Sequence, residues 1–158
     1  MNARDFEIFL HYDAWANRRL IETCGSFPGG AVPPEIADLL RQGLVQGRLW
    51  LTRLTGEEQP EVLQSATPAD WRRAYAEFDG RFQAFIKSLV PIDMSRTVSF
   101  AEANRMPFHL SLPMAVSHVV FLQASLRENI ILAMRQAGVV PPACDFMSFA
   151  LESGVMRP

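Results

Sequence analysis

Histidine, carboxylate and amide side chains are the groups in this sequence that could hold a metal ion. The chain has three histidines, His11, His109 and His118. A zinc site needs three or four strong ligands, and two of them commonly stand three or four residues apart on one helix face. None of the histidines has a second histidine or a cysteine at that spacing. His118, Gln42 and a carboxylate would make a weak site at best, so we expect no metal and no other cofactor.

The motifs of common enzyme classes are missing as well. The sequence has no GxSxG nucleophile motif, no glycine-rich phosphate loop and no HExxH metal motif. Ser117 is next to His118, but neighbouring residues of a helix point in different directions, so the two do not form a catalytic pair. Cys24 and Cys144 lie in no CxxC pair, and we expect two buried thiols in a reducing compartment. Whether the chain is an enzyme stays open from these residues.

Composition and charge exclude several classes of protein. The chain of 158 residues is 49% hydrophobic and 20% charged, which is an ordinary globular composition, and its length predicts one domain over residues 1–158. The chain has 15 Lys and Arg residues and 17 Asp and Glu residues, so its net charge is −2. It lacks the basic patch that is typical of a nucleic-acid binder. The first residues lack the apolar core of a signal peptide, and no apolar run is long enough for a membrane span. We therefore expect a soluble cytoplasmic protein that binds neither nucleic acid nor membranes.

Hydrophobic periodicity predicts an all-α fold. Apolar residues recur at three- and four-residue steps in four long stretches, Thr67 caps the third, and a further short helix follows the capping residue Asp145. Between Arg96 and Leu110 two short extended runs predict a small hairpin or an extended crossover. The expected helices cover residues 5–24, 35–54, 68–89, 113–137 and 145–151. Four long helices with one long, partly extended connection between the third and fourth make a four-helix bundle.

Two glycines in the second expected helix carry positional information. Gly43 and Gly47 lie four residues apart, and each costs about 1 kcal/mol relative to alanine inside a helix. They indicate a close helix crossing or an opening beside a pocket. In the same helix we expect Leu49 and Trp50 on the inward side.

Three motifs in order resemble the DinB/YfiT-like superfamily of four-helix proteins. The segment YDAWANRRL at residues 12–20 is similar to the first-helix signature of that family, and LWLTRL at residues 49–54 is similar to its W-x-x-R-L segment. The fourth helix and its tail, from His118 to Phe146, resemble the most diagnostic stretch of the family. The resemblance spans nearly the whole chain. It implies a cytoplasmic four-helix bundle and a homodimer.

Members of this family typically hold a divalent metal such as nickel or zinc with three histidines, one from the second helix and two from the fourth. Three protein ligands leave positions open for water or a thiolate, and several relatives are thiol-dependent transferases or isomerases. Counted from Trp50 and His118, the three ligand positions hold Gln42, Leu122 and Leu126 in this chain. Leucine cannot coordinate a metal, and a neutral amide is a poor ligand for nickel or zinc. The metal chemistry of the family therefore does not carry over.

The region of the lost metal site would remain as a ligand pocket. Its expected lining is Gln42, Gln46, His118, Leu122, Leu126 and Arg127. We expect a protein that binds a small apolar or amphipathic ligand there, or that has a non-catalytic, stress-related role with no small ligand.

The alternative is a transferase or isomerase that uses mycothiol, bacillithiol or a glutathione-type thiol without a metal. In that case Arg127, His118 and Gln42 would bind the thiol. His118 itself is expected to be a hydrogen-bonded core histidine or, alternatively, a polar wall of the cavity.

Overall fold

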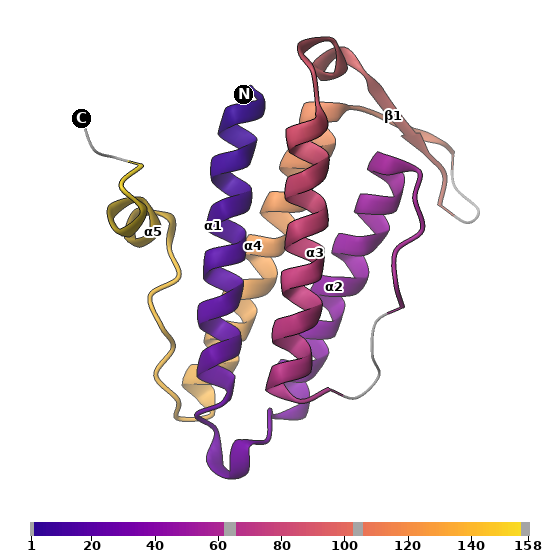
Figure 1. The fold of residues 1–158 in the computed structure, drawn as a ribbon. Helices are drawn as coiled ribbons and strands as arrows, with labels where there is room; N and C mark the ends of the chain where they lie inside the picture. Colours follow the sequence, from indigo (N-terminus) through magenta and orange to yellow (C-terminus); the bar gives the residue numbers. More distant parts are fainter. Residues whose placement is uncertain (1, 62–65, 103–105, 156–158) are drawn as a thin grey trace.

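A computed structural model describes residues 2–61, 66–102 and 106–155 of the chain (Figure 1). In this part of the chain five helices pack together, and a small two-stranded hairpin lies between the third and the fourth. The prediction of a mostly helical fold with an extended connection before the last long helix is confirmed. The elements are α1 (Ala3–Cys24), α2 (Pro34–Thr55), α3 (Pro68–Ser88), β1 (Thr97–Phe100), β2 (Phe108–Ser111), α4 (Leu112–Gln136) and α5 (Phe146–Ser153).

Local sequence signals set the helix ends. The Thr67 hydroxyl accepts a hydrogen bond from the backbone N–H of Asp70 at 3.2 Å, and the Asp70 carboxylate accepts one from the N–H of Thr67 at 2.9 Å. Asp145 caps α5 in the same way, because its carboxylate accepts the N–H of Ser148 at 2.9 Å. These bonds satisfy backbone donors that have no partner inside the helix, which is why helices begin after such residues. Both predicted caps are confirmed.

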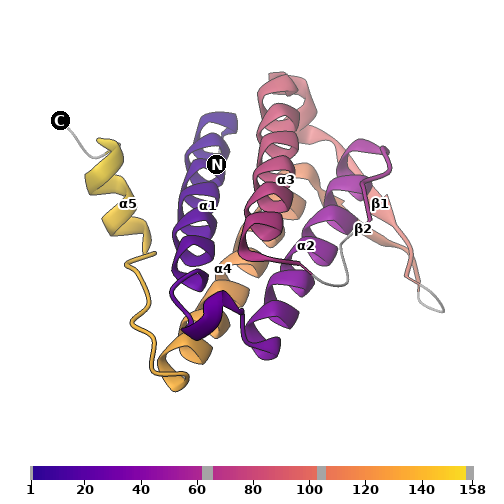
Figure 2. The same cartoon turned by 60° about the horizontal axis from the view of Figure 1, so that its bottom comes forward.

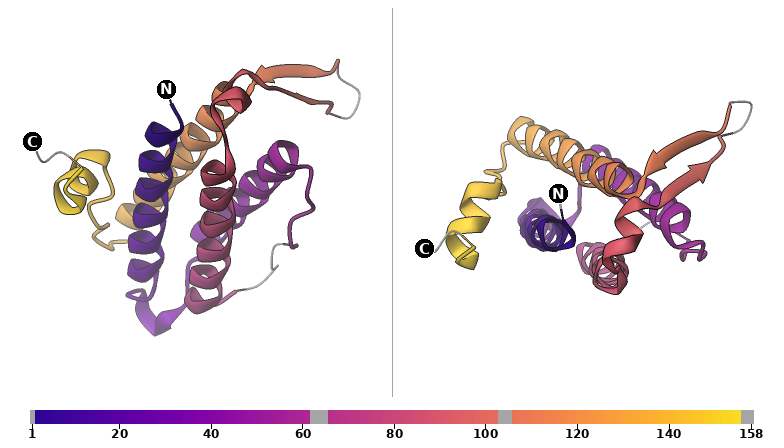
Figure 3. Two further views of the ribbon diagram at one scale, coloured as in Figure 1. Left: turned by 45° about the horizontal axis from the view of Figure 1, so that its top comes forward. Right: turned by 90° about the horizontal axis from the view of Figure 1, so that it is seen from above.

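The four long helices surround one core. α1 packs against α3 and α4, and α2 packs against α4 and α3. α5 lies against the outer side of α1, while the hairpin projects on the opposite side of the molecule, beyond α2 and α4 (Figures 2 and 3). No helix in the described residues has the length and the apolar character needed to cross a lipid bilayer.

The core consists of aromatic and aliphatic side chains from every long helix. Trp71 is 1% exposed and Trp50 is 5% exposed, as expected for inward residues. The prediction for Leu49 is wrong, because its side chain is 41% exposed. Successive residues of a helix are rotated by about 100°, so the burial of Trp50 turns the preceding residue toward the surface.

The connection between α3 and α4 forms an antiparallel hairpin in which Thr97 faces Ser111 and Phe100 faces Phe108. The turn end of its paired strands is attached to α2 by aromatic contacts. The rings of Phe100 and Trp50 meet edge to face with centroids 4.9 Å apart, and the Arg53 guanidinium lies 4.1 Å from the Phe100 centroid. Such aromatic and cation–π contacts hold a short hairpin that has little core of its own.

Gly43 and Gly47 mark the place where α2 crosses its neighbours most closely. A Cβ atom on Gly47 would lie 2.6 Å from Phe78 Cζ on α3 and 3.0 Å from Gln123 Nε2 on α4. A Cβ atom on Gly43 would overlap the Tyr75 hydroxyl. The missing side chains also let Gln123 Nε2 donate a hydrogen bond to the Gly43 carbonyl at 2.9 Å. The predicted close crossing is confirmed.

The crossing predicts opposite effects of alanine at two helical glycines. Gly47→Ala should lower the free energy of unfolding by ~1–3 kcal/mol, because the added methyl overlaps the Phe78 ring. Gly80→Ala on α3 is the matched control, because nothing lies within 4 Å of its Cβ position. We expect it to raise the free energy of unfolding by ~0.5–1 kcal/mol through helix propensity. Urea unfolding followed by circular dichroism measures both, and a Gly47→Ala variant as stable as the parent would contradict the crossing.

Candidate functional site

The six residues expected to line a ligand pocket lie in different surroundings. Gln42 is exposed on α2 and lines a shallow hollow with Leu39, Asn129 and Leu132, and none of the other five residues lines that hollow. Gln46 is half-buried. Leu126 is 6% exposed and Leu122 packs partly buried against the core, so both fill space with hydrocarbon.

His118 is exposed, and the expectation of a core histidine is wrong. Its ring lies on the outside of α4, with its centroid 4.7 Å from that of Trp50. The buried face of α4 is formed by Ala115, Val116 and Val119, all fully buried. The histidine side chain therefore points to the edge of that face and covers Trp50.

Arg127 is the member of the six whose polar group reaches the interior. It is 3% exposed, and its Nη2 donates to Asp13 Oδ1 on α1 at 2.5 Å. Nη1 donates to Asn17 Oδ1, also on α1, at 3.3 Å. The guanidinium carbon lies 5.0 Å from the centroid of the Tyr12 ring, which adds a cation–π contact. The arginine thus has its main partners on α1.

Helix periodicity brings these groups together. Asp13 and Asn17 are one turn apart and continue the buried face of α1 that holds Leu10 and Leu20. Arg127 continues the buried face of α4 between Gln123 and Ile130. Because α1 and α4 pack along each other, the charges meet inside the bundle and are shielded from water.

Asp79 on α3 adds a second carboxyl group to this cluster. Burial and the nearby Asp13 raise the pKa of Asp79 to about 8, although Arg127 and Asn17 act to lower it. Burial raises the pKa of Asp13 less, to about 6, because Arg127 contacts it directly. At neutral pH Asp13 is therefore the ionised partner of Arg127, and Asp79 keeps its proton. The Arg127 guanidinium thus interacts electrostatically with both carboxyl groups, and only that of Asp13 is charged at neutral pH.

Asn17 and Asp79 interact with each other inside the bundle. The Asn17 side chain acts through a hydrogen bond to lower the pKa of Asp79, although the geometry at Nδ2 is not that of an ordinary hydrogen bond. Asp79 has no ion-pair partner among the described residues. Asp79 is therefore the titratable group of the cluster that an added partner could stabilise.

A groove between α1 and α3 opens onto Asp79. It has a volume of about 250 Å³. Its residues are Ala14, Arg18 and Ile21 from α1 and Arg72, Tyr75, Ala76, Asp79, Gly80 and Gln83 from α3. Gly80 has open space where a side chain would be, and neither packing nor backbone geometry requires a glycine there. The groove is therefore a concave site with a titratable group of shifted pKa, the combination that most often marks a binding or active site.

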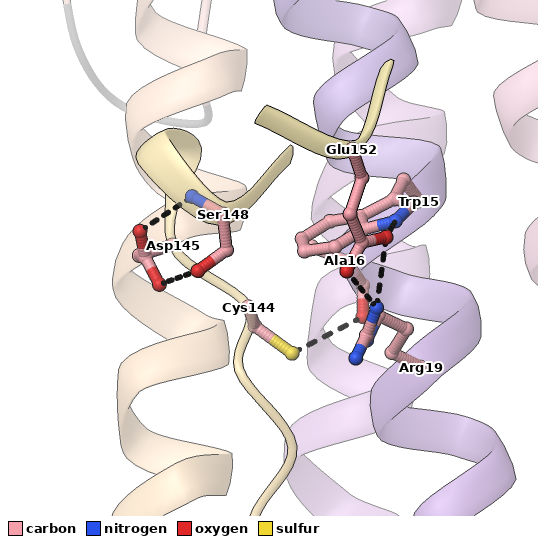
Figure 4. A network of polar contacts seen from close by, with 7 residues as sticks. All are labelled: Trp15, Ala16, Arg19, Cys144, Asp145, Ser148 and Glu152. Carbon is pink, nitrogen blue, oxygen red and sulfur yellow. Dashed lines mark hydrogen bonds and ion pairs between the residues drawn. The ribbon is translucent and has the colours of Figure 1, made fainter. Parts of the chain in front are cut away.

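The tail after α4 covers the opposite side of α1 (Figure 4). Glu152 on α5 accepts hydrogen bonds from Arg19 at 2.8 Å and from the Trp15 indole at 3.1 Å. The Tyr12 hydroxyl donates to the Cys144 carbonyl at 2.9 Å, which connects the tail to the residue beneath Arg127. The tail thus shields the Asp13–Arg127 pair from solvent on that side.

The two cysteines are buried and unpaired, as expected. Burial raises the pKa of both Cys24 and Cys144 to about 11. Both thiols are therefore protonated at neutral pH, and the nucleophilic thiolate form is scarce.

Among the described residues, no group of three or more histidine, cysteine, aspartate or glutamate side chains is placed to hold a metal ion. Comparison with protein-family models, with curated proteins and with solved structures found no match for the chain.

The acidic part of this cluster lies outside the sequence predictions, although the sequence carries a signal for it. Asp13 falls within the apolar stripe of α1, and Asp79 falls between Phe78 and Phe82 on α3. A charged residue on an apolar helix face requires a buried partner, since an isolated charge in the interior is very costly. Searching the other helices for that partner would have pointed to Arg127.

The shifted pKa of Asp79 predicts a pH-dependent effect of its replacement. Because the folded-state pKa lies above the unfolded value of about 4, stability contributed by the protonated carboxyl is complete below pH ~4 and is lost as the pH rises through ~8. Asp79→Asn keeps a neutral group at all pH values. It should change the free energy of unfolding little at pH 4 and raise it by ~1–3 kcal/mol at pH 9.

Urea unfolding of both proteins between pH 4 and pH 9 measures this difference. Asp38→Asn, at an exposed acid on α2, is the control for the loss of one surface charge. A stability difference between Asp79→Asn and the parent that stays constant over this range would contradict the assignment.

Proposed function

We propose that this chain is a DinB-like four-helix bundle that binds a small amphipathic ligand in the groove between α1 and α3, without a metal. The order of its three sequence motifs supports the family assignment, and so does the succession of four long helices with a hairpin before the last. The observation that carries the binding function is the groove that holds the Asp79 carboxyl, a titratable group of raised pKa, beside Arg18 and Arg72.

Asp79 lies in a concave place and has no ion-pair partner among the described residues. A titratable group of shifted pKa in a groove favours a ligand that interacts with it. Gly80 also favours a binding site, because a glycine within a helix costs stability and here leaves the groove open. Apolar atoms of Ala14, Ile21 and Ala76 provide contact for a hydrocarbon portion of the ligand.

A metal of the family type does not fit the residues present. The two positions on α4 are leucines, one buried and one half-buried, and neither side chain has a donor atom. Gln42, at the third position, is exposed on α2. The proposed function therefore includes no step at a metal.

A thiol-dependent transferase has less support. It would use Arg127, but that guanidinium is buried and bonded to Asp13 and Asn17. His118, its second residue, packs on Trp50 at the outside of α4. We therefore give preference to ligand binding.

The homodimer stays a prediction. The exposed edge where α2 and α4 meet would suit it, because α4 carries no charged residue from Leu112 to Leu126. Phe121 is 68% exposed and Met114 is 60% exposed along this stretch. Large apolar side chains gathered on a surface commonly mark an interaction site.

The proposal predicts ligand binding that depends on the open groove and does not depend on a metal. In a thermal-shift assay of untagged protein against small amphipathic acids, amines and alcohols, at least one compound should raise the melting temperature. Gly80→Leu, which fills the groove, should lose that shift. Ala84→Leu, one turn further along α3 and outside the groove, should keep it.

Nickel and zinc titrations of the same protein test the proposal that it functions without a metal. We expect no stoichiometric binding of either ion. Tight binding of one ion per chain, or a panel without any hit, would contradict the proposed function.

A further inference from the structure

The geometry points to a carboxylate as the polar head of the ligand. We infer that the groove binds a small amphipathic carboxylic acid, with its head between Arg18 and Arg72 next to Asp79 and its apolar body along Ala14 and Ala76. This inference rests on the proposed function and names the chemical class of the ligand.

The charges that face the groove favour an anion. The charged residues along it are Arg18, Arg72 and Asp79. Within the described residues neither Arg18 nor Arg72 pairs with a carboxylate, whereas the neighbouring Arg73 pairs with Asp70. Two unpaired guanidinium groups at one groove form a ready site for a carboxylate, which arginine binds through paired hydrogen bonds.

Asp79, which lines the groove, is also a hydrogen-bond donor. Asp13 and Asn17 from α1, Arg127 from α4 and Tyr75 from α3 surround Asp79, and burial together with Asp13 raises its pKa to about 8. The Asp79 carboxyl therefore carries a proton at neutral pH and can donate it in a hydrogen bond. A carboxylate accepts hydrogen bonds and donates none, so it can accept the proton of Asp79 while it pairs with Arg18 and Arg72.

An ammonium group fits the same groove less well. It would have to approach two guanidinium groups of the same charge, and it would need Asp79 in its ionised form. The volume of about 250 Å³ lies below the range of most ligand pockets, which selects a short molecule over a long lipid or a nucleotide.

The test compares three probes that share one hydrocarbon chain: octanoate, octylamine and octanol. Isothermal titration of the untagged full chain at pH 7 should show octanoate binding at least ~10-fold more tightly than octanol, because charge-assisted hydrogen bonds contribute about 1.5–3 kcal/mol. Octylamine should bind more weakly than octanol. Raising the pH to 9 should weaken octanoate binding, because the ionised Asp79 repels the carboxylate.

Two substitutions locate the head of the ligand, and two more serve as controls. Arg18→Gln and Arg72→Gln should each weaken octanoate binding by ~5-fold or more while octanol binding changes little. Arg73→Gln is the matched control, because this exposed arginine is next to Arg72 but does not line the groove, and we expect less than ~2-fold change. Gly80→Leu should abolish the binding of octanoate, which shows that the probe occupies the groove.

The possible failures are distinguishable. Octylamine binding more tightly than octanoate, or equal binding of all three probes, would overturn the carboxylate inference and leave the proposed binding function intact. Octanoate binding that is insensitive to Arg18→Gln and Arg72→Gln, or to Gly80→Leu, would also overturn the inference. If no probe binds and the wider panel gives no hit, the proposed function itself fails.

Discussion

The ion pair between Arg127 and Asp13 is the constraint on which the arrangement of this bundle depends. Both side chains are buried, and a buried charge that loses its partner costs several kcal/mol, so α1 and α4 must pack in the one register that brings the two groups into contact. Asn17 and Tyr12 on α1 occupy further faces of the same guanidinium. Asp79 from α3 then completes a polar centre in an otherwise hydrocarbon core. Three of the four long helices are therefore aligned by electrostatics in addition to apolar packing.

The same centre gives the protein its best candidate site. One guanidinium compensates one carboxylate, so the second carboxyl group is neutral at physiological pH. This protonated carboxyl of Asp79 lines the α1/α3 groove, while the tail covers the far side of α1. Leu122 and Leu126 on α4 contribute apolar volume to the bundle, and Gln42 on α2 is exposed. The proposed ligand site is thus separate from that region, and it is built on the cluster that holds the helices together.

Much of the fold could be predicted from the sequence because its signals are local. Thr67 and Asp145 cap helices through their own neighbours, and Gly43 and Gly47 mark a crossing that only glycine permits. The prediction for His118 is wrong because apolar residues occur nearly all round the first part of α4, so periodicity does not fix which face is buried. The prediction for Leu49 is wrong because it is next to Trp50, and two neighbouring residues of a helix point in different directions. The Asp13, Asp79 and Arg127 cluster joins residues up to 114 positions apart on three helices. An acid on an apolar helix face indicates a buried partner, but no local pattern encodes which groups meet. The groove follows from the packing of α1 on α3, so it could not be predicted from the sequence either.

The central claim is that two carboxyl groups share one guanidinium and that Asp79 keeps its proton at neutral pH. A pH titration of the side-chain carboxyl carbons by nuclear magnetic resonance, with the Asp79 signal assigned from Asp79→Asn, measures this directly. We expect the pKa of Asp79 at about 8 and that of Asp13 at about 6. A folded protein in which Asp79 titrates near the ordinary value of about 4 would contradict the account, because its carboxylate would then be ionised at neutral pH.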